Sequence, residues 1–366
     1  MKRELDQILD DYISKSDYRD LIIETEGLVN NSPKIIIQLL EKLTHKDVEH
    51  EWKRSQLKDR FTSYLLQLEE ETQIDITYEV IRKFSNQLHV KEIADKLCFF
   101  VSQSKLFNKI LRTKEEEALK EFNRLLINEL LLRGKVFSEE EKKIVLKSLS
   151  DFDLNWVELE LDEIEKDLPL RSYSLNGGSC GISFGLQSEE KFPYSFSDFE
   201  GINLVRNKNE KINNLASMIS REYIHLIEVG DFEYFKEDVF DLEAGIICHL
   251  NYQESLSESV KIAFKHIDSK DVFKYLFNMS VFGGAYERGE FGATSRINTW
   301  KVISGLLQKD YFVSDKKEIL AKLNEYRWTE FSCDNGWFIN EWLDLGIIGI
   351  NENENKYAVL VISDTD

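Results

Sequence analysis

Apolar residues in the first half of the chain recur at the spacing of an amphipathic α-helix. In Glu115–Arg133, the side chains of Ala118, Phe122, Leu125 and Leu130 form part of one broad apolar stripe. Intervals of three or four residues place side chains on a single helical face. Comparable stripes occur in Asp17–Glu26, Pro33–Leu43, Trp52–Leu68, Tyr78–Leu88 and Val90–Val101. We therefore predict about eight short helices in this half.

Few residues in this half break helices, and those that do suggest where helices end. The only glycines and prolines through residue 168 are Gly27, Pro33 and Gly134. The two glycines follow apolar segments, as C-terminal caps do. Ser138–Glu141 and Thr113–Glu116 fit the capping box that begins a helix. A run of short helices joined by tight turns is typical of a HEAT-like array. Because no repeat of fixed period is visible, the sequence is also compatible with the alternative interpretation, an irregular α-solenoid or bundle.

The segment Asp151–Asp167 contains eight acidic residues and one lysine. It is interpreted as the solvated face of a connecting element, or alternatively as a docking strip for a cationic partner. Glycines and prolines become frequent directly after it, which indicates a change of domain. The sequence thus predicts a helical array over residues 1–165 and an α+β domain over residues 166–366.

The second half mixes strand and helix patterns. Short turn-bounded segments of β-branched and aromatic residues predict strands, whereas apolar residues at helical spacing predict helices. The expected strands are Gly181–Gln187 and Gly201–Val205, and the expected helices are Lys208–Ile227, Leu256–Ile267 and Asp271–Phe282. Two apolar runs, Leu345–Ile350 and Tyr357–Ile362, flank a polar turn and predict a β-hairpin. The expected fold is therefore mostly α: a helical array followed by an α+β domain with a C-terminal β-hairpin.

The main candidate site is the glycine-rich stretch Val281–Trp300, which separates two apolar helical segments. The pair Gly283 and Gly284 suits a left-handed C-terminal cap, and a second helix is expected to begin at Gly292 or Thr294.

Two readings of this stretch remain open. Arg288 and Arg296 could hold an anion together with the first amides of the second helix. In the other reading, the glycines shape a tight helix hairpin and Arg296 pairs internally with a carboxylate, for which Asp344, Asp364 and Asp366 are the candidates.

Two segments in the second half of the chain resemble motifs of a bacterial family. GGAYERGEFGATSRINTW and the later WFINEWLDLGIIGINENENKYAVLVISDTD are similar to a family with a GGAY-x-x-G-x-x-GA-x-x-R-x-x-x-W motif and a WDLG, hairpin and TDTD-like ending. The resemblance covers about the last ninety residues and departs at Thr294–Ser295 and Ile362–Ser363. The family has no established activity. The resemblance implies one recurrent constellation, either core or site, made of Gly283, Gly284, Tyr286, Gly289, Gly292, Arg296, Trp300, Trp342, Asp344, Gly346, Asp364 and Asp366. Arg288 is added to the candidate site residues because it could help to hold an anion.

Charge and cysteine usage narrow the function classes. The net charge is −20, which disfavours binding of phosphate backbones, so no nucleic-acid partner is expected. The four cysteines lie far apart, without metal-ligand spacing, so we expect them to be reduced and predict no metal and no cofactor. No signal peptide or membrane-spanning run is recognisable, so a cytoplasmic location without a membrane partner is expected.

The sequence favours a non-enzymatic interaction or immunity-type regulatory protein with a protein partner, and the acidic charge favours a basic one. The alternative is an anion- or nucleotide-binding or hydrolytic domain that uses Arg288, Arg296 and the C-terminal aspartates. The sequence makes no prediction about the oligomeric state.

Overall fold

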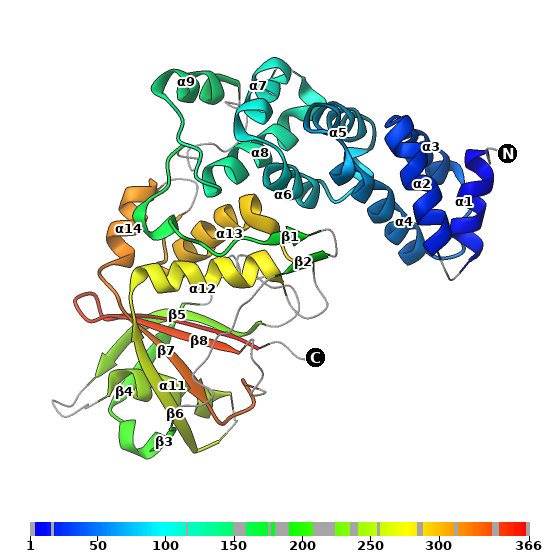
Figure 1. The fold of residues 1–366 in the computed structure, drawn as a ribbon. Coiled ribbons are helices and arrows are strands. Elements are labelled where there is room, and N and C mark those ends of the chain that lie inside the picture. Colours follow the sequence, from blue (N-terminus) through cyan, green and yellow to red (C-terminus); the bar gives the residue numbers. More distant parts are fainter. Residues whose placement is uncertain are drawn as a thin grey trace. The chain divides into compact units, whose positions relative to one another are not determined.

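The computed structural model divides the chain into two compact units, Met1–Phe152 and Asp153–Asp366 (Figure 1). We call them the helical unit and the sheet unit. The structure describes residues 4–15, 18–114, 116–148, 159–174, 177–179, 190–207, 224–234, 241–254, 257–283, 288–310, 314–338 and 344–363. The division falls earlier than the boundary expected at residue 165, because the 3₁₀ turn η5 (Glu163–Glu165) packs against a helix of the sheet unit.

The helical unit consists of short helices, several of which pack against the next helix but one along the chain. Helices α1, α3, α5 and α7 contact one another in succession, and α6 contacts α8. Ion pairs join some of these helices: Lys42 of α3 binds Asp6 of α1 at 2.7 Å, and Lys109 of α7 binds Asp75 of α5 at 2.7 Å. The helices are α1 Leu5–Ser14, α2 Arg19–Asn31, α3 Ile35–His45, α4 Glu51–Ser63, α5 Glu70–Phe84, α6 Val90–Phe100, α7 Gln103–Thr113, α8 Lys120–Leu132 and α9 Glu139–Ser148, with 3₁₀ turns η1 Tyr64–Gln67, η2 Ser85–Gln87 and η3 Glu117–Leu119.

The predicted helical first half is confirmed, but its caps are confirmed only in part. Gly134 has φ +86° and ends α8, where Lys135 N donates to Leu130 O at 2.9 Å, as in a Schellman motif. Ser138 and Glu141 form the expected capping box. Gly27 instead lies inside α2, and Thr113 is the last residue of α7, since neighbouring apolar contacts extend both helices past the local signals.

The sheet unit is built on a seven-stranded antiparallel sheet with strand order β3-β6-β7-β8-β9-β5-β4. The predicted C-terminal hairpin is confirmed as β8 and β9, with Leu345 opposite Ile362 and Asn351 opposite Lys356. A separate two-stranded sheet pairs β1 with β2. The strands are β1 Ser172–Ser174, β2 Gly177–Ser179, β3 Phe192–Ser195, β4 Ile202–Arg206, β5 Ile224–Tyr234, β6 Ser259–Ile267, β7 Arg327–Cys333, β8 Leu345–Asn351 and β9 Lys356–Ile362.

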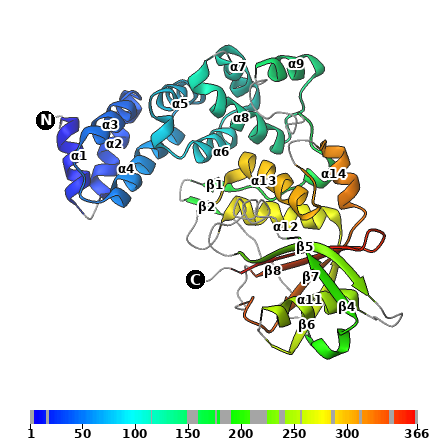
Figure 2. The ribbon, with the colours of Figure 1, turned by 180° about the vertical axis from the view of Figure 1, so that it is seen from behind.

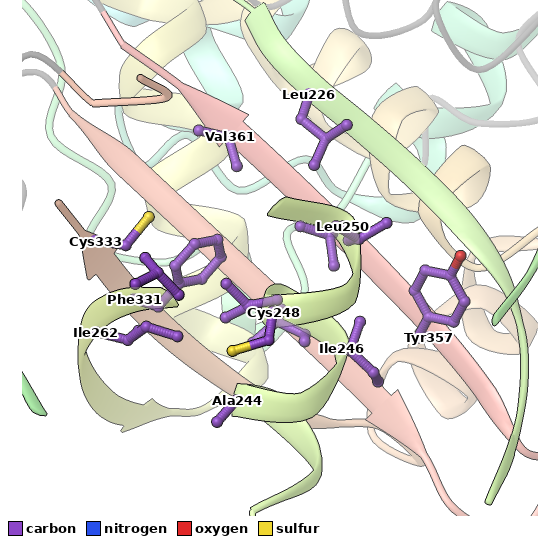
Figure 3. Close-up of a cluster of buried hydrophobic side chains, with 14 of the residues drawn as sticks. Leu226, Ala244, Ile246, Cys248, Leu250, Ile262, Phe331, Cys333, Tyr357 and Val361 are labelled. Carbon is purple, nitrogen blue, oxygen red and sulfur yellow. The ribbon is translucent and has the colours of Figure 1, made fainter. Parts of the chain in front are cut away.

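Helices cover both faces of this sheet (Figures 1 and 2). Helix α11 (Leu242–Gln253) lies on one face, where Ile246 and Leu250 pack among Ile262, Phe331 and Val361 of the strands (Figure 3). Helices α12 (Ser269–Phe282) and α13 (Phe291–Leu306) pack together on the other face. The short helix η6 (Phe196–Phe199) contacts α11, and α14 (Lys316–Leu323) precedes β7.

Two helix predictions in the sheet unit are wrong. Ser259–Ile267 is the strand β6, because Val260 and Ile262 are buried while Ser259 and Lys261 are exposed, a period of two that the apolar content of the segment obscured. Ile224–Ile227 belongs to β5 rather than to a helix. The strand expected at Gly201–Val205 is β4, Ile202–Arg206. Gly181–Gln187 and residues 208–223 lie outside the described residues.

Candidate functional site

The glycine-rich stretch forms the connection between α12 and α13. Gly283 ends α12 with a positive φ of 66°, which favours glycine, but its ψ of −169° lies outside the left-handed helical region that the double-glycine signal predicts. Helix α13 begins at Phe291, one residue before Gly292. Gly289 has φ +70°, and a Cβ atom there would lie 2.2 Å from the carbonyl oxygen of Val281. Only glycine allows both this backbone conformation and this close approach. Gly289 therefore packs directly against the last turn of α12.

Arg171, which the sequence analysis did not single out, holds this connection together. Its Nη2 donates to the carbonyl oxygen of Val281 at 2.8 Å, and its Nε donates to the same oxygen at 3.2 Å. Nη2 also donates to the carbonyl oxygen of Arg288. The guanidinium lies over the ring of Phe291, with 4.4 Å to its centroid. A cation at this place satisfies carbonyl groups that the end of α12 leaves without helical partners.

Arg296 of α13 is buried, and it binds a carboxylate that the sequence did not suggest. Its Nε donates to Oε1 of Glu165 at 2.7 Å, and its Nη2 donates to the backbone carbonyl of Glu160 at 3.2 Å. The side chain of Arg296 is 2% exposed and that of Glu165 is 0% exposed. The sequence suggested three aspartates as partners of Arg296. Of these, Asp344 accepts a hydrogen bond from Ser363, and Asp364 and Asp366 lie outside the described residues.

Three further groups complete the shell around Glu165. Lys316 at the start of α14 donates to Oε2, and Trp300 Nε1 donates to Oε1 at 2.9 Å. The backbone amide of Asp162 donates to Oε2 at 2.8 Å, and Asp162 in turn pairs with Lys316 at 2.5 Å. Lys316 also lies 5.3 Å from the centroid of the Trp300 ring. We call Asp162, Glu165, Arg296, Trp300 and Lys316 the Glu165 cluster.

The electrostatics of the cluster favour a permanently ionised Glu165. Burial alone would raise the pKa of this carboxyl, but the charges and hydrogen bonds of Arg296 and Lys316 outweigh it and lower the pKa to about 2. Two cations face two carboxylates, so the cluster is neutral overall. Nε and Nη2 of Arg296 already donate hydrogen bonds within the protein, and the side chain does not reach solvent. Anion binding by Arg296 would therefore require this cluster to open.

Asp344 and Ser363 meet at the open end of the β8–β9 hairpin. Ser363 Oγ donates to Asp344 Oδ1 at 2.5 Å, and both residues are buried. They directly flank the strand pair Leu345–Ile362. This contact links the two strands at the end of the hairpin and gives the buried carboxylate a hydrogen-bond donor.

The predicted constellation is thus distributed over three places. Glu165 brings Arg296 and Trp300 together. The α12–α13 connection and the start of α13 contain Gly283, Arg288, Gly289 and Gly292, of which Arg288 is exposed. Asp344 lies at the end of the hairpin. Gly284, Tyr286, Trp342, Asp364 and Asp366 lie outside the described residues.

One local signal could have identified Glu165. Asp162 and Glu165 have the spacing of a capping box, and the structure contains that box at η5. Within the acidic segment Asp151–Asp167, the reading as a solvated face is therefore wrong for Glu165, which is buried by Arg296 and Lys316. Lys316 carries no comparable sequence signal, since it occupies an ordinary first-turn position of α14.

Among the residues that the structure describes, no group of three His, Cys, Asp or Glu side chains could hold a metal ion, and no helix is long and apolar enough to cross a membrane. Cys98, Cys248 and Cys333 are buried free thiols. Burial raises the pKa of Cys248 to about 12, which keeps this thiol protonated and unreactive.

Comparisons with known proteins identify a family and no individual relative. No curated protein and no solved structure matches the chain. One family model, described as a family of unknown function, matches residues 23–366. The match extends through nearly all of the helical unit as well as the sheet unit, well beyond the last ninety residues in which the motifs resemble a known family. The chain belongs to the family of unknown function DUF6183.

Proposed function

We propose that this protein is a non-enzymatic interaction protein, of a regulatory or immunity type, whose sheet unit attracts a basic protein partner. The observation that carries the proposal is the distribution of charge between the two units. Met1–Phe152 contains 26 Lys and Arg against 29 Asp and Glu, whereas Asp153–Asp366 contains 21 against 38. The acidic excess therefore belongs to the sheet unit, where it creates a field that draws in cationic surfaces.

Internal pairing leaves this excess uncompensated. In the sheet unit, Arg296 and Lys316 bind Glu165, Lys322 binds Glu325 at 2.8 Å, and Arg327 binds Glu243 at 3.1 Å. These cations already have acidic neighbours, and 21 cations cannot neutralise 38 carboxylates. The remaining negative charge is available to a partner.

One exposed acidic strip offers a specific place for this attraction. Asp231 and Glu233 are exposed on β5, opposite Val205 and Asn203 of the edge strand β4. Val205 is 50% exposed, so an apolar side chain lies beside the two carboxylates. A rim of charge around an apolar contact is typical of protein interfaces. The helical unit, in this proposal a HEAT-like array, contributes a second surface in the cytoplasm.

Charge reversal tests the proposal in the full-length protein. Wild type, a double variant Asp231→Lys with Glu233→Lys, and a control Asp20→Lys with Asp47→Lys in the helical unit are used to capture proteins from the native host at about 0.1 and 0.5 M salt. Wild type and the control should retain a partner with a basic surface. The double variant should lose this partner, and high salt should release it from wild type. Retention that is unaffected by both changes would refute the electrostatic proposal.

A further inference from the structure

We propose that the edge strand β4 binds an extended, cationic segment of a partner protein as an additional strand of the sheet. This inference rests on the proposed function, because the acidic strip of Asp231 and Glu233 supplies the attraction for the segment. It adds the way in which the partner is held, which is by backbone hydrogen bonds along β4. Strand addition combines main-chain hydrogen bonds, which give affinity, with side-chain contacts, which give specificity.

The outer side of β4 carries backbone groups without partners. Among the described strands, β4 pairs with β5 alone. The amide of Asn207 donates to the carbonyl oxygen of Val229 at 2.9 Å, and hydrogen-bonded positions alternate along an antiparallel pair. Val205 therefore directs its amide and carbonyl groups toward β5, whereas Leu204 and Arg206 direct theirs away from the sheet. Within the part of the chain that the structure describes, these outward groups have no hydrogen-bond partner.

The opposite edge of the sheet is less suited to an added strand. It is formed by β3, which has four residues and contains Pro193, a residue without an amide hydrogen. Proline on an edge strand hinders pairing with a further chain. Strand β4 has the sequence INLVR, which contains no proline. Of the two edges, β4 is therefore the one that can accept a continuous ladder of hydrogen bonds.

The side chains on one face of β4 define the charge of the segment. Asn203 and Val205 are exposed and lie opposite Glu233 and Asp231 in the register of the sheet. Neighbouring strands lie about 4.8 Å apart, so an added strand would run roughly 10 Å from β5. A lysine or arginine side chain can reach across β4 to a carboxylate of the strip, and an apolar residue between two such cations can contact Val205. The segment that fits has a cation two residues before and two residues after an apolar residue.

A second copy of this chain does not fit the same edge. Pairing β4 with β4 of another copy would place two acidic strips on one face of a continuous sheet. Like charges on neighbouring strands are destabilising. The occupant is therefore a different chain of opposite charge.

A synthetic peptide tests the proposal on the full-length protein. The probe is Ser-Lys-Thr-Val-Val-Lys-Ser-amide with tetramethylrhodamine at its N-terminus, and binding is measured by fluorescence anisotropy at about 0.1 M salt. In antiparallel pairing, its lysines lie opposite Asn207 and Asn203, and its two valines lie opposite Val205 and Leu204. We expect saturable binding that the double variant Asp231→Lys with Glu233→Lys abolishes. The same peptide with glutamate in place of both lysines should not bind.

Methylation of one backbone nitrogen at a time provides a matched pair of peptides. The second valine directs its amide toward the carbonyl oxygen of Leu204, whereas the first valine directs its amide to solvent. N-methylation of the second valine should weaken binding at least about fivefold, which is the effect of one lost backbone hydrogen bond. N-methylation of the first valine should change binding by no more than about twofold.

Position 206 offers matched variants of the protein. Both Arg206→Pro and Arg206→Thr remove the ion pairs to Glu228 and Glu254, but only proline also removes the outward amide hydrogen. Because this amide takes no part in pairing with β5, both variants should keep the wild-type circular dichroism spectrum. Arg206→Pro should bind the unmodified peptide at least about fivefold more weakly than Arg206→Thr. The N-methylated peptides test the same hydrogen bonds on the wild-type protein, without any substitution.

Three results would overturn the inference. The first is a lack of saturable binding by the unmodified peptide, or equal binding of the two N-methylated peptides. The second is capture of a basic partner from the host that the Asp231 and Glu233 double variant loses but that Arg206→Pro retains as well as Arg206→Thr; the proposed function would then stand without strand addition. The third is a wild-type dimer in analytical ultracentrifugation that Arg206→Pro alone dissociates, because a second copy would then occupy β4.

Discussion

The guanidinium of Arg296 donates from Nε to Oε1 of Glu165 across 2.7 Å, in a place where neither side chain meets solvent. The two residues are far apart in sequence, and their contact joins η5 to α13. Because Lys316 and Trp300 bind the same carboxylate, one acidic side chain fixes three elements of the sheet unit. The strongest sequence motif of the chain therefore contributes an internal ion cluster to the fold.

Removing the central carboxylate should be strongly destabilising. Glu165→Gln leaves Arg296 and Lys316 buried without their shared anion, which we expect to lower the free energy of unfolding by about 3–5 kcal/mol. Urea denaturation followed by circular dichroism measures this change. Glu163→Gln is the control, because Glu163 is exposed and pairs with Lys166 at 2.6 Å on the surface. A loss no greater for Glu165→Gln than for Glu163→Gln would contradict the structural role.

The low pKa of Glu165 makes part of the stability depend on pH. The carboxyl has a pKa of about 2 in the folded protein and an ordinary value of 4.5, so the unfolded chain binds more protons between these values. The contribution is present in full above about pH 5 and is lost as pH falls toward 2, amounting to on the order of 3 kcal/mol. Denaturation curves between pH 7 and 2 should show this component in wild type. Its persistence in Glu165→Gln would argue against the assignment.

Two glycine substitutions should have opposite signs. Gly289→Ala forces a side chain into positive φ and against the Val281 carbonyl, so we expect a loss of at least about 1–3 kcal/mol. Gly27→Ala lies on an exposed face within α2, with no atom within 4 Å of the added Cβ, and should stabilise by about 0.5–1 kcal/mol. Thermal and urea denaturation of both variants check the pair. Destabilisation by both, or by neither, would contradict these backbone assignments.

Arg171 should be needed to keep the α12–α13 connection closed. Arg171→Met retains an apolar stem over Phe291 but removes the charged hydrogen bonds to Val281, at an expected cost of about 1.5–3 kcal/mol. Arg171→Lys keeps the charge without the two-pronged geometry and should lie between wild type and Arg171→Met. Hydrogen exchange at the last turn of α12 provides a local measurement. Protection there that is equal in all three proteins would refute the role.

Local patterns predicted much of the fold. Helical periodicity was sufficient for the first half, and the polar turn between two apolar runs was sufficient for the β8–β9 hairpin. The failures occurred where tertiary pairing decides the structure. Val260 and Ile262 in β6 alternate with polar residues, but the local sequence also fits a helix. Pairing with β3 and β7 is what makes this segment a strand.

The candidate site was less predictable, because its partners are distant in sequence. The motif identified Arg296 and Trp300, and the expectation of an internal ion pair named three carboxylates near the C-terminus. Glu165 lies in a segment whose acidic composition favours a solvated surface, although Asp162 and Glu165 carry a capping signal. A charge count along the chain cannot distinguish a solvated carboxylate from one that folding places between two cations.

The most direct test of the Glu165 cluster is a double-mutant cycle between Glu165→Gln and Arg296→Met, measured by urea denaturation at pH 7. If the two residues form one buried pair, removing both should cost less than the sum of the single losses, with a coupling energy of at least about 1.5 kcal/mol. Losses that add to within about 0.5 kcal/mol would contradict the account, because they would show that Arg296 and Glu165 stabilise the protein independently.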